Sequence, residues 1–234
     1  MDPSFVTPPV PESPRPTGRL IGDALRRPGG RRALSVLSLV LALAGVGMFA
    51  YPFGTDLYSK RIQNRLRSQF DDVEYAQSYQ LRKIKVGQGL TRLRIPKLDV
   101  EVLVVEGTTP AALKAGAGHY VGTPLPGEAG NVAIAGHRTT FGRPFNRMDE
   151  LGQGDKVYLD TPFATFEYSV VPAFGGHDNP WATSPQDFSV VGKPSSPEAK
   201  TLTLTTCHPK GSARERLILR LTLTGTKIVK KPAA

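Results

Sequence analysis

Two patterns of hydrophobic and polar positions divide this chain. Residues 33–51 form an apolar run of 19 residues that contains no charged side chain. From residue 91 onward, apolar and polar residues alternate in short runs that Gly, Pro and Asp residues separate. About 20 consecutive apolar residues are needed to cross a bilayer as a helix, whereas alternation with a period of two is typical of strands. The pattern predicts one membrane-spanning helix followed by a mainly β domain.

The alternating part of the chain predicts many short strands. They are expected over residues 93–95, 100–105, 118–121, 132–135, 155–160, 165–171, 202–206 and 216–224. Helices are expected over residues 56–73, 109–114 and 145–151. Residues 173–200 are rich in Pro, Gly and Ser, and a loop of that length is usually functional. Many short strands joined by turns favour a barrel or a sandwich.

The chain is expected to divide into five segments. Residues 1–32 hold seven prolines, six arginines and few large apolar groups, so they are predicted to be a disordered basic tail. The other segments are a signal-anchor helix (33–52), a juxtamembrane helix and linker (53–90), the main folded domain (91–225) and a basic C-terminal tail (226–234).

The predicted anchor helix is flanked by unequal numbers of basic residues. Residues 13–32 carry six arginines, and residues 52–71 carry four basic residues. Because basic residues favour the cytoplasmic side, the N-terminus is predicted to be cytoplasmic and the β domain extracytoplasmic. The alternative is a cleavable signal peptide with a small-x-small site at Ala42-Leu43-Ala44, although the apolar run continues beyond that site.

The net charge of +10 predicts an anionic neighbour. Much of the excess lies in the predicted tails and the juxtamembrane stretch, and the sequence contains no nucleic-acid-binding motif. A membrane and cell-wall polymers are therefore favoured as neighbours over nucleic acid.

The single cysteine, Cys207, follows the alternating run Leu202 to Thr206, so it is predicted to lie at the end of a strand. Another predicted strand, residues 132–135, leads into His137. Two such strand ends can meet across a sheet, and a cysteine with a distant histidine is the general arrangement for thiol acyl transfer. A buried structural cysteine is the alternative.

Arg216 opens the last predicted strand. Its guanidinium cannot act as a base, but it can donate hydrogen bonds to an oxyanion or to a substrate backbone. The alternative is a surface ion pair with Glu215.

These residues carry a resemblance to a known family. Thr203-Leu204-Thr205-Thr206-Cys207 resembles the TLxTC signature of sortases, the cysteine transpeptidases of Gram-positive cell surfaces. Gly136-His137-Arg138 is similar to the segment that holds their histidine, and Arg216 occupies the place of their arginine. The resemblance extends from about residue 93 to residue 223 and is strongest to class E sortases.

The resemblance implies an eight-stranded sortase-type β-barrel with short peripheral helices, preceded by one transmembrane helix, and it makes residues 91–225 the catalytic domain. Cys207 would be the nucleophile, and His137 would supply positive charge to its thiolate and protonate a leaving amine. The substrate would be a surface protein with an LAxTG- or LPxTG-like sorting signal, cleaved between Thr and Gly. The acceptor would be an amine of lipid II or peptidoglycan.

Two further residues are candidates for substrate binding. Tyr120 matches a strand tyrosine that the resemblance links to the LAxTG preference, and Thr206 is a candidate to bond the substrate or the oxyanion beside Cys207. The alternatives are an ordinary half-buried strand aromatic for Tyr120 and simple β-propensity for Thr206.

The remaining histidines are weaker candidates. His208 directly follows Cys207 and is expected on the opposite face of the strand. His119 is expected to be structural, and His177 lies in the long loop. The sequence holds no His or carboxylate cluster with metal-ligand spacing, so no metal, calcium included, and no other cofactor is expected.

Two other functions stay open. A pilin-polymerising sortase would use a lysine of another pilin as the acceptor, although the Asp-Pro-aromatic motif of its lid is absent from residues 53–90. A catalytically silent module that binds sorting signals or cell-wall peptides would not need His137, Cys207 and Arg216 together. The Ser-His-Gly-Cys motif of L,D-transpeptidases is absent.

Overall fold

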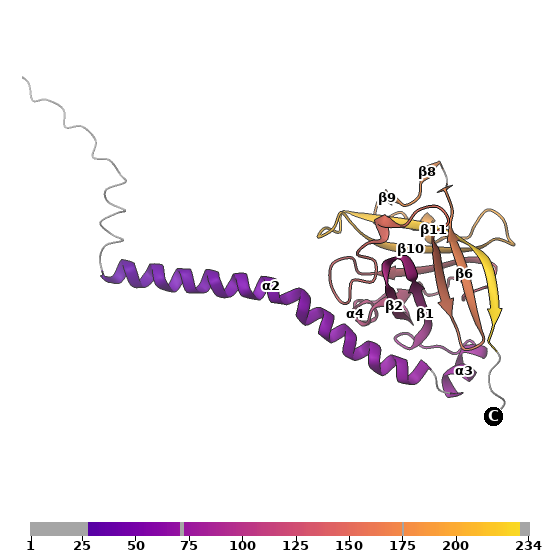
Figure 1. The fold of residues 1–234 in the computed structure, drawn as a ribbon, viewed down its shortest axis with the longest axis horizontal. Helices are drawn as coiled ribbons and strands as arrows, with labels where there is room; N and C mark the ends of the chain where they lie inside the picture. The colour runs from indigo at the N-terminus through magenta and orange to yellow at the C-terminus, as the bar shows by residue number, and fades with distance from the viewer. Residues whose placement is uncertain (1–27, 71–72, 175, 230–234) are drawn as a thin grey trace, which may run out of the picture. The chain divides into compact units, whose positions relative to one another are not determined.

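A ring of strands closes where the last two long strands pair. The computed structural model describes residues 28–70, 73–174 and 176–229. The ring follows the order β10-β4-β3-β2-β1-β5-β6-β11, and β10 also pairs with β11, so eight strands form a closed barrel (Figure 1). The predicted eight-stranded barrel is therefore confirmed.

The strands of the ring are β1 (Gly89–Ile95), β2 (Val100–Glu106), β3 (Ala117–His119), β4 (Gly130–Gly136), β5 (Lys156–Asp160), β6 (Ala164–Val170), β10 (Lys200–His208) and β11 (Glu215–Ile228). The predicted long loop over residues 173–200 contains β7 (Ala173–Phe174), β8 (His177–Asp178), β9 (Trp181–Thr183) and the 3-10 helix η3 (Phe188–Val191). β9 pairs with the start of β11.

The barrel is filled by the inward-facing side chains of its strands. The largest core cluster includes Leu202 and Leu204 of β10, Val132 and Ile134 of β4, and Leu219 of β11. Side chains of a strand point alternately to its two faces. The residues between these, such as Thr203 and Thr205, consequently lie on the other face of β10.

The helices are α2 (Pro28–Phe70), α3 (Val73–Gln80) and α4 (Pro110–Ala115), with the 3-10 helices η1 (Pro96–Leu98) and η2 (Met148–Glu150). α2 includes the predicted anchor and residues 56–70 of the predicted juxtamembrane helix, and its apolar part is long enough to cross a membrane. Residues 71–72 lie outside the described residues, and Val73 begins α3. Of the predicted disordered tail, residues 1–27 lie outside the described residues and residues 28–32 are helical.

The described part of the chain divides into two units after Ala50. Within the second unit, the end of α2 packs on β2 and α4 through a smaller apolar cluster that includes Leu66, Phe70, Leu103 and Ala112. Gln63 fixes this contact, because its side-chain amide donates to the carbonyl of Leu103 at 2.9 Å and accepts from the N–H of Leu103 at 2.7 Å.

Two predicted elements differ in the structure. The helix expected over residues 145–151 is reduced to the 3-10 helix η2, and Phe145, Met148 and Leu151 are all buried in the core. Residues three apart eclipse one another in a 3-10 turn, so this short turn already aligns the three apolar side chains. At the C-terminal end, β11 continues to Ile228, beyond the predicted domain boundary at residue 225, because residues 225–228 pair with β6.

Candidate active site

The backbone ladder between β10 and β11 places Cys207 beside Arg216. The two residues are direct partners in the antiparallel register, followed by the pair His208 and Glu215. Directly opposed residues of an antiparallel pair project to the same face of the sheet. Cys207 is a free, half-buried thiol, and Arg216 is also half-buried. Hydrogen bonding between main chains thus sets the spacing of this pair.

His137 reaches the same face from β4. The parallel ladder between β4 and β10 ends with the pair Ala135 and Thr205, and His137 and Cys207 each lie two residues further along. Alternation therefore puts both side chains on the face of their strand that carries Ala135 and Thr205. The three predicted catalytic residues therefore lie at the ends of neighbouring strands, at one end of the barrel.

Beyond the end of the β4–β10 ladder, side chains maintain the connection between the two strands. The Thr206 hydroxyl donates to the carbonyl of Gly136 at 2.8 Å. The Arg138 guanidinium donates to the carbonyl of Cys207 at 3.3 Å. These two hydrogen bonds link the segment that ends in His137 to the segment that carries Cys207.

Thr206 is buried, and alternation puts it on the opposite face of β10 from Cys207. Because its hydroxyl proton is donated to Gly136, that proton is not available to a substrate or an oxyanion. The structure therefore does not bring Thr206 to the face that holds the predicted catalytic residues.

Arg138 is a buried cation beneath the candidate active site, with only 3% of its surface exposed. Its Nη2 lies 3.0 Å from Asp149 of the η2 turn, and its Nη1 lies 2.8 Å from Nδ1 of His208. A guanidinium has only donors, so Nδ1 of His208 accepts and the ring proton of a neutral His208 is on Nε2. His208 therefore forms part of the support for Cys207 and is not a competing base.

The electrostatic surroundings of His137 disfavour its charged form. Burial lowers the pKa of His137 below its ordinary value, and the positive charge of Lys114 lowers it further. The imidazole packs against the ring of Phe141 at a centroid distance of 5.2 Å. The Lys114 ammonium lies 5.7 Å from the centroid of the same Phe141 ring.

Arg216 is held by main-chain carbonyls at the start of β11. Its Nη1 donates to the carbonyls of Ala213 and Glu215, each at 3.1 Å. The Glu215 carboxylate instead lies 4.0 Å from Nε2 of His208. The guanidinium is thus oriented by the backbone, and its Nε and Nη2 groups are its remaining donors.

Tyr120 also lies on the Cys207 face of the barrel. Its hydroxyl is 3.1 Å from the hydroxyl of Thr205, which precedes Cys207 by two residues on the same face of β10. The turn after Tyr120 is fixed by Thr123, whose hydroxyl donates to the Tyr120 carbonyl at 2.8 Å. The neighbouring His119 is buried, with Nδ1 2.8 Å from a Glu106 carboxylate oxygen.

Toward the other end of β10, the η3 segment lies over this face. The carbonyl of Val190 accepts from Asn131 at 3.2 Å, from Thr203 at 3.3 Å and from Arg220 at 2.9 Å. Burial lowers the pKa of Arg220 to about 10. Three donors from β4, β10 and β11 therefore fix one wall above the strands that carry the candidate catalytic residues.

Several residues of this site have no role predicted from the sequence. Thr205 was detectable, because a period of two puts it, and not Thr206, on the face of Cys207. Arg138 stood in the recognised Gly-His-Arg segment, but its partners are distant in sequence. The contact of Phe141 with His137 and the effect of the Lys114 charge on it left no signal in the pattern. Among the described residues, no group of three or more His, Cys, Asp or Glu side chains is placed to hold a metal ion.

Comparison with known proteins agrees with this geometry. Residues 93–224, more than half of the chain, match the family model of the sortase domain. The chain is 37% identical over 148 residues to Sortase SrtE1 of Streptomyces coelicolor, covering 57% of this chain and 40% of that protein. It is 34% identical over 140 residues to Sortase D of Bacillus subtilis, covering 58% and 65% of the two chains.

A solved structure of a Clostridium perfringens Sortase D5 transpeptidase superposes with a TM-score of 0.59 at 30% sequence identity. That superposition covers 72% of this chain and 99% of the other. The chain spans less than two thirds of the length of the two curated relatives. The family match, the closed barrel and the three residues at its end agree, and the chain belongs to the sortase family, whose members are cysteine transpeptidases.

Proposed function

We propose that this protein is a membrane-anchored transpeptidase that joins surface proteins to a cell-wall amine. It would cleave the Thr–Gly bond of an LAxTG- or LPxTG-like sorting signal. The observation that carries the proposal is the register of β10. This register pairs Cys207 with Arg216 and puts Thr205 beside Ala135, two residues before His137. A nucleophile, a proton carrier and an oxyanion donor on one face are the parts that acyl transfer requires.

The first half of the reaction forms a thioester. The Cys207 sulfur attacks the carbonyl carbon of the Thr residue, and the Arg216 guanidinium stabilises the oxyanion that develops on the carbonyl oxygen. When the C–N bond to Gly breaks, His137 gives its proton to the departing amine. The carboxyl part of the signal remains on Cys207 as an acyl group.

The second half returns the enzyme to its starting state. A primary amine attacks the thioester carbonyl, His137 accepts the proton of the amine, and the Cys207 thiolate leaves. The acceptor would be an amine of lipid II or of peptidoglycan. The overall exchange of one amide for another requires neither an oxidant nor a metal.

Tyr120 is proposed to contact the residue between Leu and x in the signal. Its support is its position, since its hydroxyl bonds Thr205 on the face of Cys207. Thr206 is proposed to act indirectly by fixing Gly136 and hence the end of β4. The apolar part of α2 is proposed to anchor the chain, with the N-terminus cytoplasmic and the barrel extracytoplasmic; its support is the length of the apolar stretch and the flanking arginines.

The test is a transpeptidation assay with the full chain in detergent. Fluorogenic LAxTG and LPxTG peptides would be supplied with an amine acceptor, and Cys207→Ala would serve as the inactive control. Mass spectrometry would follow the acyl adduct on Cys207 and the new amide product. We expect both species with the wild-type chain. We also expect the LAxTG peptide to be turned over faster than the LPxTG peptide, and we expect Tyr120→Phe to reduce this difference.

The outcomes separate the proposed function from its alternatives. Peptide binding without any adduct, from a folded chain, would favour a silent binding module. An adduct that is resolved by a protein lysine, but not by a peptidoglycan-like amine, would favour a pilin polymerase.

A further inference from the structure

The loop that follows His137 adopts an unusual backbone conformation. Phe141, Gly142 and Arg143 are consecutive residues with φ values of +51°, +77° and +48°. Glycine tolerates this left-handed region, but it is unfavourable for a bulky residue such as Phe. Such a conformation persists only where surrounding contacts over-determine it.

Those contacts come from α2. The Asp56 carboxylate accepts the N–H of Gly142 at 2.9 Å with one oxygen and Nη2 of Arg143 at 2.6 Å with the other. The Asp56 side chain is 17% exposed and that of Arg143 is 46% exposed, so the carboxylate of this pair is partly shielded from solvent and the guanidinium is not. The hydroxyl of Ser59 lies directly against Gly142.

The same loop contacts the catalytic imidazole. The Phe141 ring packs edge-on against Tyr58 of α2, with a centroid distance of 6.4 Å and an interplanar angle of 75°. The centroid of the same ring lies 5.2 Å from that of the His137 imidazole. A continuous set of contacts therefore runs from α2 through Phe141 to His137.

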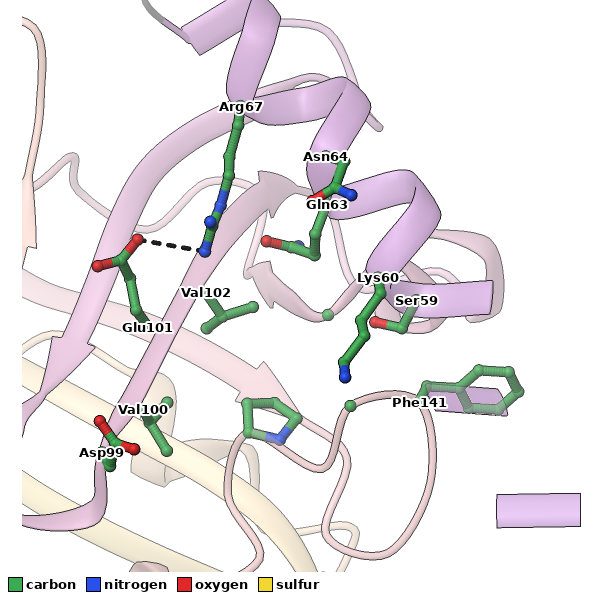
Figure 2. Close-up of a pocket in the computed structure, with 13 residues that line it drawn as sticks. Ser59, Lys60, Gln63, Asn64, Arg67, Asp99, Val100, Glu101, Val102 and Phe141 are labelled. Carbon is green, nitrogen blue, oxygen red and sulfur yellow. Dashed lines mark ion pairs between the residues drawn. The ribbon is translucent and has the colours of Figure 1, made fainter. Parts of the chain in front are cut away.

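The contacts between α2 and the loop over residues 141–143 lie at one end of a cavity beneath α2. A cavity of about 390 Å³ separates the helix from the start of β2, and Ser59, Gly142 and Phe141 are among the residues that line it. In Figure 2, Phe141 lies near Ser59 and Lys60, while the Arg67–Glu101 ion pair closes the opposite end. The helix and the catalytic loop thus meet through Asp56 and its neighbours, and not through a continuous packed interface.

We propose that Asp56 is a positioning residue for the catalytic reaction. By holding the left-handed loop, it keeps Phe141 against His137 and so fixes both the direction and the solvent exposure of the imidazole. Asp56 belongs to the helix that continues from the apolar segment, so the element that would anchor the chain also sets the geometry of the active site. This inference rests on the proposed function only through the role given to His137.

The test compares Asp56→Ala and Asp56→Asn with a matched control in the full chain. Glu101→Gln removes a different ion pair to the same helix at the far end of the same cavity, with side chains about half exposed. We expect kcat of Asp56→Ala to fall about tenfold with KM changed less than twofold, because small misplacements of a catalytic group mainly affect the chemical step. Asp56→Asn retains an acceptor for Gly142 and should lose about threefold.

A second measurement needs no substrate. Proton NMR of the imidazole would follow the titration of His137 in each variant. Burial lowers the pKa of His137 in the wild-type chain. Release of Phe141 would expose the ring, so the His137 pKa should rise in Asp56→Ala and stay unchanged in Glu101→Gln.

The two measurements separate this inference from the proposed function. A wild-type chain that forms no thioester would overturn the proposed function, while the titration would still test the role of Asp56. If Asp56→Ala showed the same kcat and the same His137 titration as Glu101→Gln, the positioning role would be overturned. A fall in thermal midpoint with kcat per folded molecule unchanged would overturn it as well, because it would show that Asp56 serves only stability.

Discussion

Cys207 and His137 reach the same face of the barrel by different means. Cys207 and Arg216 lie inside the β10–β11 ladder, which continues to the pair His208 and Glu215. His137 lies beyond the last pair of the β4–β10 ladder. Its carbonyl accepts the N–H of Phe145 at 3.2 Å, and side chains provide its other contacts. The candidate nucleophile and its arginine are thus fixed by backbone register, whereas the candidate histidine depends largely on a small set of individually replaceable side-chain contacts.

This difference separates two kinds of mutational effect. A backbone ladder consists of many hydrogen bonds, so no single side chain controls the distance from Cys207 to Arg216. The position of His137 depends on Arg138, on Thr206 through Gly136, and on Phe141. Substitutions of Cys207 or Arg216 should abolish activity without changing the structure. Substitutions of the side chains around His137 should displace the imidazole.

The largest effect is expected for Arg216→Gln. The loss of an oxyanion donor lowers kcat by about 10²–10³-fold. Because the Arg216 guanidinium donates to carbonyls next to it in the chain, the thermal midpoint should change little. The measurement is kcat for the sorting-signal peptide beside a melting curve. An unchanged kcat would contradict the role given to this arginine.

Arg138→Gln should lower both activity and stability. The change leaves the Cys207 carbonyl, His208 and Asp149 without their shared buried partner. We expect the free energy of unfolding to fall by about 2 kcal/mol and kcat to fall about thirtyfold as the two strand ends separate. Denaturant unfolding and steady-state kinetics give the two values.

Asp149→Asn is the matched control for Arg138→Gln, because it alters only the outer partner, whose side chain is 44% exposed. Equal losses of activity in the two variants would show that the contacts with Cys207 and His208 are not the important ones.

Thr206→Val should have a smaller effect. Valine keeps the branched shape and removes the hydrogen bond to Gly136, so about 1 kcal/mol of unfolding free energy should be lost. The accompanying fall in kcat should be about threefold, without a change in KM. A rise in KM with kcat unchanged would instead support the prediction that Thr206 contacts the substrate.

The smallest effect is expected for Lys114→Met, which removes a charge near His137. Burial lowers the His137 pKa first, and the Lys114 charge adds to this effect. Without that charge, the pKa of His137 should rise, and the limb of the pH–rate profile that reports His137 should move to higher pH. Since Lys114 is exposed, salt should screen the difference between the two proteins.

The lowered pKa of His137 also makes the free energy of unfolding depend on pH. A histidine with a pKa below its unfolded value binds fewer protons in the folded state, so the wild-type protein loses stability as the pH falls from the ordinary histidine range through the lowered pKa. In Lys114→Met this loss should be smaller. Unfolding measured between neutral and mildly acidic pH tests the sign.

Local sequence patterns account for the features of the fold and the site that could be predicted from the sequence. Alternation located the barrel strands, and the positions of Cys207, His137 and Arg216 at strand ends followed directly from it. Alternation also assigns faces, and a period of two puts Thr205, and not the predicted Thr206, on the face of Cys207. The helix expected over residues 145–151 was wrong because the apolar spacing of three suits a 3-10 turn as well as a helix.

The sequence by itself determined the strands, the apolar helix and the identity of the three candidate catalytic residues, because these depend on periodicity and on short motifs. Only the tertiary structure decided which side chains hold His137 in place. Arg138 and the carbonyl of Cys207 are 69 residues apart in the chain, and Asp56 and Arg143 are 87 apart. Contacts over such separations depend on how the barrel closes and where α2 packs, and neither leaves a periodic trace in the residues that make the contact.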